Sequence, residues 1–144
     1  MISRFLFLSV LIFMASISLH AQNSCLGVVT DSVSKMGWES KNYSNYKITY
    51  SYEEAVEYCS KLTICEKKWR IPTLKELQSL LDVDHIPTIN PHLFPYAVAD
   101  LYWSSTYPKE SQLFSYGLSF GSGRATSDHE GGRFYIRCIT KETL

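Results

Sequence analysis

The sequence is 144 residues long and carries 14 Lys and Arg against 14 Asp and Glu, so it is formally neutral at pH 7. This length suits a single domain. Because nucleic-acid binding depends on neutralising phosphate charges, the near-neutral balance excludes nucleic acid as the natural partner.

The first 21 residues predict a secretory signal peptide. Arg4 makes the start positive, residues 5–17 are apolar apart from two serines, and the segment ends in the small residue Ala21. The apolar run is shorter than the ~20 residues of a membrane-spanning helix. We therefore expect cleavage after Ala21, a single exported domain over residues 22–144, and no integral membrane segment after cleavage. Cys25 does not directly follow the cleavage point, which argues against a lipid anchor.

All four cysteines lie in the predicted exported part: Cys25, Cys59, Cys65 and Cys138. An even number of cysteines in an oxidising compartment favours two disulfides. Zinc is the competing interpretation, but the chain has no Cys-x-x-Cys pair. Cys59 and Cys65 are six residues apart, which on a helix directs them to different sides. Two pairings therefore stay open from the residues alone.

Two short strands and a helix are predicted in the amino-terminal half. Residues 27–31 and 36–39 have β-branched or aromatic cores, with Trp38 as the anchor of the second. Residues 40–50 are polar and rich in tyrosine, which indicates a surface loop. A capping box of Ser51 and Glu54 then predicts a helix. Its apolar positions recur at helical spacing: Tyr52, Ala55, Val56, Cys59 and Leu62.

A second helix is predicted after Pro72, which forces the residue before it into an extended conformation. Thr73 and Glu76 repeat the capping box. Four leucines then form one apolar stripe and predict a core-facing helix: Leu74, Leu77, Leu80 and Leu81.

A loop and an antiparallel meander are predicted next. Three prolines exclude a helix in residues 82–96. Residues 101–106 predict a strand by composition, and alternating apolar residues in 114–120 predict a half-buried strand. That strand is expected to turn at 121–123 and to pair with 124–126.

The last strand is predicted over residues 134–140, after a turn at 128–132. Phe134, Ile136 and Cys138 share one face of it, and Tyr135, Arg137 and Ile139 share the other. Short strands, two helices and then a meander make an α+β fold.

An ordered set of motifs also connects the chain with a known family. The motifs are Val29-Thr30-Asp31, Trp38, the Ala55 to Cys59 helix with Leu62, Trp69-Arg70-Ile71-Pro72-Thr73 with Glu76-Leu77, Phe94-Pro95, Tyr102-Trp103-Ser104-Ser105-Thr106, Phe120-Gly121 and Tyr135-Ile136-Arg137-Cys138. Together they span about Val28 to Ile139. In this set the chain resembles the bacterial domain family typified by the C-terminal domain of the Legionella collagen-like adhesin. Ser34 to Trp38 departs from the usual Thr-Gly-Leu-Met-Trp, and no collagen-like repeat is present.

The resemblance implies a C-type-lectin-like fold with two helices packed on short antiparallel sheets. It also implies the disulfides Cys59–Cys138 and Cys25–Cys65. Members are exported, and the named adhesin's domain is associated with sulfated glycosaminoglycans. We therefore expect a secreted or periplasmic recognition module that binds a glycan or a cell-surface protein. The alternatives are an accessory component of a cell-surface or pilus-like assembly and, more remotely, an enzyme related to the formylglycine-generating oxidases.

No metal, cofactor or catalytic centre is expected. Calcium needs six to eight oxygen ligands, and the lectin calcium motifs are absent. The acidic clusters near a histidine, at 82–85 and 128–130, are interpreted as helix-end and turn residues. Cys138 stands alone in the carboxyl-terminal part, and no nucleophile, base and orienting group can be assembled.

Ligand contacts are expected in the loops at 107–112 and 122–133. The candidate residues are Tyr107, Lys109, Arg124, His129 and Arg133, which can stack on sugars and pair with sulfate or carboxylate. Solvated loop residues are the competing interpretation. Trp38, Trp69 and Trp103 are expected in the core. Lys67, Lys68 and Arg70 form a small basic cluster, in which Arg70 is expected to fix the loop before the second helix.

Overall fold

The structure is a computed structural model that describes residues 25–31, 34–110, 114–129 and 132–141. Its helices and its two small antiparallel sheets confirm the predicted α+β class. The arrangement is compatible with a C-type-lectin-like fold. The predicted signal peptide, residues 1–21, lies outside the described residues.

Each of the two sheets has three strands. The first has the order β1–β2–β6 and consists of β1 (Val28–Asp31), β2 (Met36–Glu39) and β6 (Ile139–Lys141). The second has the order β3–β4–β5 and consists of β3 (Leu101–Trp103), β4 (Phe114–Ser119) and β5 (Ala125–His129). Trp38 in β2 lies opposite Val29 in β1 and Ile139 in β6. The first sheet therefore joins the two ends of the domain.

Helix α1 (Tyr52–Lys61) begins at the predicted capping box. The Ser51 hydroxyl accepts a hydrogen bond from the Glu54 N–H at 3.2 Å, and the Glu54 carboxylate accepts one from the Ser51 N–H at 2.9 Å. This exchange satisfies two donors that the first turn leaves without helical partners. A single 3-10 turn, η1 (Ile64–Glu66), follows the helix.

Helix α2 (Leu74–Gln78) also begins at its predicted capping box, but it ends earlier than the leucine stripe suggests. Leu77 is buried, whereas Leu80 is only partly buried and Leu81 forms an isolated bridge with Ile89. The prediction of one helix through Leu81 is therefore wrong. The last two leucines contact the core from a turn, because the chain there pairs with the following loop.

The carboxyl-terminal segment packs against two hydrophobic clusters by alternation. Ile136 and Cys138 belong to one cluster together with Trp69 and Trp103, whereas Ile139 and Tyr135 contact the other, around Trp38. This confirms the predicted period of two. The single strand predicted over 134–140 is wrong, because β6 covers only its end and Phe134 and Tyr135 form isolated bridges to Tyr50 and Tyr102.

Two other strand limits also differ from the prediction. Strand β3 ends at Trp103 because the Ser105 N–H leaves the sheet and donates to the Pro72 carbonyl at 2.7 Å. Strand β5 includes Asp128 and His129, which the sequence placed in a turn, because they pair with Ser115 and Phe114 of β4.

Both disulfides implied by the resemblance are present. Cys25 pairs with Cys65, and Cys59 pairs with Cys138, with Cα–Cα distances of 6.2 and 5.6 Å. No cysteine is left for zinc. The three tryptophans are buried, as predicted.

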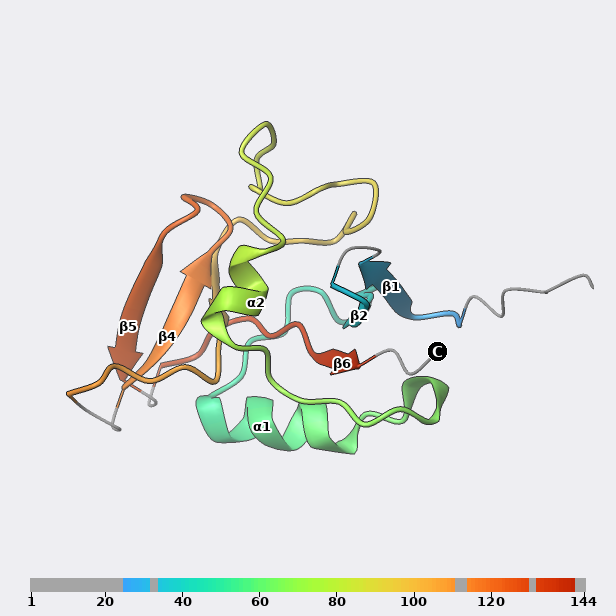
Figure 1. Cartoon of the computed structure of the whole chain (residues 1–144), viewed down its shortest axis with the longest axis horizontal. Helices are drawn as coiled ribbons and strands as arrows, with labels where there is room; N and C mark the ends of the chain where they lie inside the picture. Colours follow the sequence, from blue (N-terminus) through green and yellow to red (C-terminus); the bar gives the residue numbers. More distant parts are fainter. Residues whose placement is uncertain (1–24, 32–33, 111–113, 130–131, 142–144) are drawn as a thin grey trace, which may run out of the picture.

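Figure 1 shows how the elements are arranged. The β4–β5 hairpin lies at one end of the molecule and β1–β2 at the other, α2 lies between them, and α1 crosses on the side away from the 82–96 loop. Within the described ranges, no helix is long and apolar enough to cross a membrane.

Candidate functional site

The predicted loop residues are divided between the two ends of strand β5. Arg124 directly precedes β5 and Arg133 follows it, and the five residues of this strand span roughly 17 Å. His129 is the last residue of β5, and Lys109 is exposed in the turn beyond β3. The ring of Tyr107 packs edge-on against Tyr52 at 5.9 Å. That these residues bind a ligand stays a prediction. Strand β5 separates Arg124 from Arg133, whereas Tyr107 and Arg133 both contact the first turn of α1, through Tyr52 and Glu54.

Arg133 is engaged within the fold. Its Nη2 donates to the Glu54 carboxylate at 2.8 Å and to the Thr49 carbonyl at 2.9 Å. The hydrogen bond from Arg133 lowers the pKa of Glu54. Arg133 thus ties the start of α1 to the segment before β6.

Four polar side chains form a buried polar centre: Glu39, Lys41, Tyr58 and Arg137. Glu39 Oε1 accepts from Lys41 Nζ at 2.7 Å and from the Tyr58 hydroxyl, and Oε2 accepts from the Cys138 N–H at 3.2 Å. Arg137 Nη1 donates to the Glu39 carbonyl at 2.7 Å, and its guanidinium lies 4.6 Å from the Phe94 ring centroid. Burial lowers the pKa of Lys41 and of Arg137 and raises that of Tyr58.

This centre was not predicted from the sequence, although one signal was present. Arg137 shares a strand face with Tyr135 and Ile139, and a charge on an apolar face needs a buried partner. Nothing local identifies that partner as Glu39, which lies 98 residues earlier. The centre holds β2, α1 and the last segment together, and we assign it to the fold.

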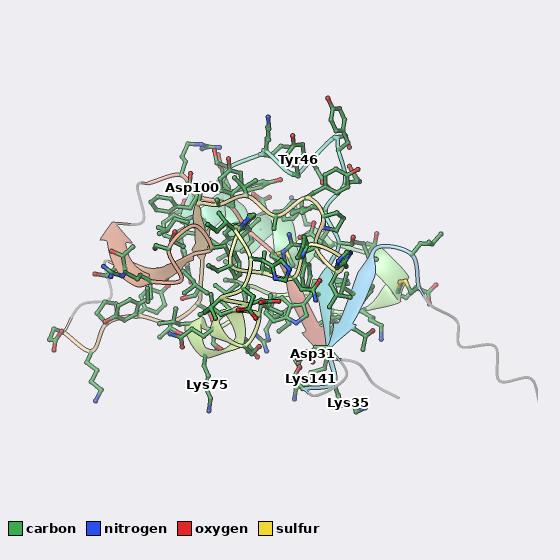
Figure 2. The ribbon with its side chains drawn as sticks, turned by 90° about the horizontal axis from the view of Figure 1, so that it is seen from above. Asp31, Lys35, Tyr46, Lys75, Asp100 and Lys141 are labelled. Carbon is green, nitrogen blue, oxygen red and sulfur yellow. A yellow bond between two sulfur atoms is a disulfide. The ribbon has the colours of Figure 1, made fainter. Side chains whose placement is uncertain are left out.

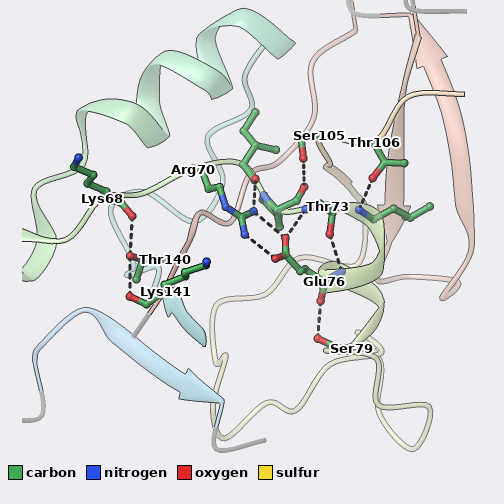
Figure 3. A network of polar contacts seen from close by, with 12 residues as sticks. Lys68, Arg70, Thr73, Glu76, Ser79, Ser105, Thr106, Thr140 and Lys141 are labelled. Carbon is green, nitrogen blue, oxygen red and sulfur yellow. Dashed lines mark hydrogen bonds and ion pairs between the residues drawn. The ribbon is translucent and has the colours of Figure 1, made fainter. Parts of the chain in front are cut away.

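A second group of charges lines a groove of about 500 Å³ on the surface. Its lining residues are Glu66, Lys67, Lys68, Trp69, Arg70, Thr140 and Lys141, which we call the basic groove. Arg70 and Ile139 exchange main-chain hydrogen bonds of 3.0 and 2.9 Å, so the 66–70 segment runs beside β6. The Thr140 hydroxyl donates to the Lys68 carbonyl at 2.7 Å (Figure 3). This pairing adds Lys141 to the cluster at 67–70.

Arg70 lines the groove but is paired with an acidic side chain, and it fixes the loop before α2 as predicted. Its two Nη atoms donate to the two carboxylate oxygens of Glu76 at 2.9 and 2.7 Å (Figure 3). The hydrogen bonds from Arg70 are the largest cause that lowers the pKa of Glu76 to about 2. The same carboxylate accepts from the Thr73 N–H at 2.7 Å, so Arg70 fixes the start of α2.

The lysines of the groove form no ion pairs with the described residues. Among the described residues, no carboxylate oxygen lies within 4 Å of the Lys67, Lys68 or Lys141 ammonium groups. Lys68 and Lys141 are exposed, and Lys67 is half-buried. Figure 2 shows Lys141 on the same side of the molecule as Lys35 and Lys75, opposite Tyr46 and Asp100.

The described residues hold no group of three or more His, Cys, Asp or Glu side chains that could bind a metal. His85 Nδ1 lies 3.0 Å from the Asp82 carboxylate, which forms one pair and not a cluster. The Ser104 and Ser105 hydroxyls donate to the Tyr116 and Pro72 carbonyls at 2.6 and 3.3 Å. These two hydroxyls therefore stabilise the main chain by hydrogen bonding to its carbonyl groups.

A search of curated proteins finds no match to the chain. Among protein families, the Lcl C-terminal domain matches residues 27–140, which is most of the sequence. The match covers β1, β2, both helices and all of β6 and the basic groove except Lys141. The chain belongs to the Lcl C-terminal domain family.

Proposed function

We propose that this protein is an exported adhesion module that binds an anionic glycan along the basic groove. The family supports an adhesin-associated role, and the amino-terminal pattern and the two disulfides support export. The observation that carries the proposal is the set of three lysines around one groove, for which the described residues offer no acidic partner.

The groove suits a sulfated or carboxylated chain better than a neutral one. Lys68 and Lys141 lie on adjacent segments, so a polyanion lying across both gains two ionic contacts. Lysine binds such groups as a flexible point charge. Exposed charges are screened by salt, so the interaction should weaken steeply as ionic strength rises.

Heparin-affinity chromatography tests the proposal, with heparin as the sulfated probe. The groove variant Lys68→Ala/Lys141→Ala should elute at clearly lower salt than the wild type. The control variant Lys47→Ala/Lys61→Ala removes the same charge from exposed sites outside the groove and should elute close to the wild type. The loop variant Lys109→Ala/Arg124→Ala tests the residues predicted from the sequence.

Each result has a defined meaning. A wild-type protein that does not bind at low salt overturns the glycan proposal and favours an accessory role in a surface assembly. Equal losses in the groove and control variants show that net charge alone causes retention. A loss confined to the loop variant moves the site to the β4–β5 end of the molecule.

A further inference from the structure

Strand β5 is the last strand of the second sheet, and only one of its two edges is paired. Its inner edge pairs with β4 in a continuous antiparallel register, from Ala125 opposite Leu118 to His129 opposite Phe114. Among the residues that the structure describes, only β4 forms main-chain hydrogen bonds or bridges with β5. Figure 1 shows β5 as the outermost strand at one end of the molecule.

One hydrogen bond at the start of β5 shows which of its main-chain groups face outward. The Ser119 N–H at the end of β4 donates to the Arg124 carbonyl at 2.9 Å. In an antiparallel strand both main-chain groups of a residue face the same edge, and this edge alternates along the strand. The groups of Thr126 therefore face β4, like those of Arg124, whereas those of Ala125 and Ser127 face the outer edge. The side chains of all four residues of β5 and its approach, 124–127, are exposed.

Other outer strands of the two sheets have their edges covered. At β3 the Trp103 N–H donates to the Tyr135 carbonyl at 2.9 Å, and at β6 Arg70 and Ile139 exchange hydrogen bonds of 3.0 and 2.9 Å. Proteins also protect an open edge with a lysine, a proline or a bulge. Strand β5 contains no lysine or proline, and its register with β4 has no bulge. Its outer edge is therefore a template to which another strand can add.

We infer that β5 is a self-association edge, to which a second copy of this chain adds its own β5 in antiparallel register across a two-fold axis at Thr126. In this register Ala125 of one copy lies opposite Ser127 of the other, so the outward main-chain groups of both copies pair. Position 124 lies opposite position 128, which places an arginine opposite an aspartate, and the two-fold axis forms this pair twice. Thr126 lies opposite itself, and such threonine pairs are favourable across strands.

The association is expected to be weak in free solution. Strand β5 has five residues, so pairing two of them buries less surface than the about 1,200–2,000 Å² of a stable complex. We expect a dimer dissociation constant on the order of 100 µM. Sedimentation velocity should therefore show a monomer at about 1 µM and a dimer at about 1 mM.

A charge series tests the partner and the register together. Arg124→Glu alone and Asp128→Arg alone each place like charges opposite one another twice, so each should weaken dimerisation by about tenfold or more. The double variant Arg124→Glu/Asp128→Arg restores opposite charges at both positions and keeps the net charge of the wild type. It should dimerise like the wild type, and an equimolar mixture of the two should form few mixed dimers.

A matched pair at Ser127 tests the main-chain bonds. Ser127→Pro removes an N–H that faces the outer edge and none that faces β4, so dimerisation should be lost while the hairpin remains. Ser127→Ala keeps the N–H and should dimerise like the wild type. In wild-type protein the Ala125 and Ser127 amide protons should become protected from exchange only at high concentration, whereas the Thr126 amide should be protected throughout.

Three results overturn the inference: a wild-type monomer at about 1 mM, a double charge variant that does not regain dimerisation, or unchanged dimerisation of Ser127→Pro. The charge series keeps its meaning even where the proline disturbs the hairpin. The basic groove shares no residue with β5. Failure of the heparin experiment therefore leaves this result unaffected, and the reverse also holds.

Discussion

The buried polar centre and the basic groove both combine basic side chains with a carboxylate, but they differ in solvent access. Glu39 and Arg137 are each 1% exposed, whereas Lys68, Arg70 and Lys141 of the groove are exposed. A buried charge needs several partners. The Glu39 carboxylate accepts hydrogen bonds from Lys41 and from the Cys138 N–H, and Arg137 donates to the Glu39 main-chain carbonyl. An exposed lysine needs none, because water solvates it. Burial therefore assigns the first group to the fold and leaves the second accessible from solvent.

The largest expected effect comes from neutralising the buried carboxylate. Glu39→Gln keeps the side-chain volume but leaves two buried cations without a counter-charge, so the free energy of unfolding should fall by about 3–5 kcal/mol. Urea denaturation measures this. The control is Glu57→Gln, which disrupts an exposed pair with Lys61 on α1 and should cost less than about 0.5 kcal/mol. Similar losses in the free energy of unfolding for Glu39→Gln and Glu57→Gln would contradict the difference drawn between buried and exposed charges.

An intermediate loss of stability is expected for Glu76, which is neither fully buried like Glu39 nor fully exposed like the groove lysines. Glu76 is 25% exposed, accepts from Arg70 and from the N–H of Thr73 just before α2, and has a pKa of about 2 in the folded protein. Glu76→Gln should reduce the free energy of unfolding at pH 7 by about 1 kcal/mol, limited by solvent screening.

The stabilisation by Glu76 should decrease as the pH falls. The pKa of Glu76 is lower in the folded protein than its ordinary 4.5, so its stabilisation is complete above that value and is lost as pH falls toward 2. The difference in stability between wild type and Glu76→Gln should shrink over that interval in an acid titration of urea midpoints. A difference that stays constant from pH 7 to pH 2 would show that Arg70 does not hold the charge of Glu76.

The smallest effect on stability is expected in the groove. Lys68→Ala/Lys141→Ala removes two exposed ammonium groups that have no acidic partner in the part of the chain that the structure describes, so the free energy of unfolding should change by less than about 0.5 kcal/mol. Thermal unfolding at matched ionic strength measures this. A large loss would assign these lysines to the fold, and a loss of heparin retention could then not be attributed to the groove.

Local signals predicted the starts of both helices because a capping box involves residues only three positions apart. Ser51 with Glu54 and Thr73 with Glu76 behave as expected. The end of α2 was not predictable in the same way. Leu80 and Leu81 continue the leucine stripe, but the bridge from Leu81 to Ile89 overrides the helical period.

The candidate sites were much less predictable than the elements. The sequence singled out Lys67, Lys68 and Arg70, but Lys141 joins them only through the pairing of Arg70 with Ile139. Arg124 and Arg133 belong to neighbouring loops in the sequence, yet β5 separates them.

The sequence alone determined the α+β class, both helix starts, the alternating faces of the last segment and the burial of the tryptophans, because each depends on period or on near neighbours. The disulfide pairing followed from the family resemblance. Only the tertiary structure decided which charges are buried together and which lysines share a groove. Those properties depend on contacts between residues tens of positions apart, which no local pattern encodes.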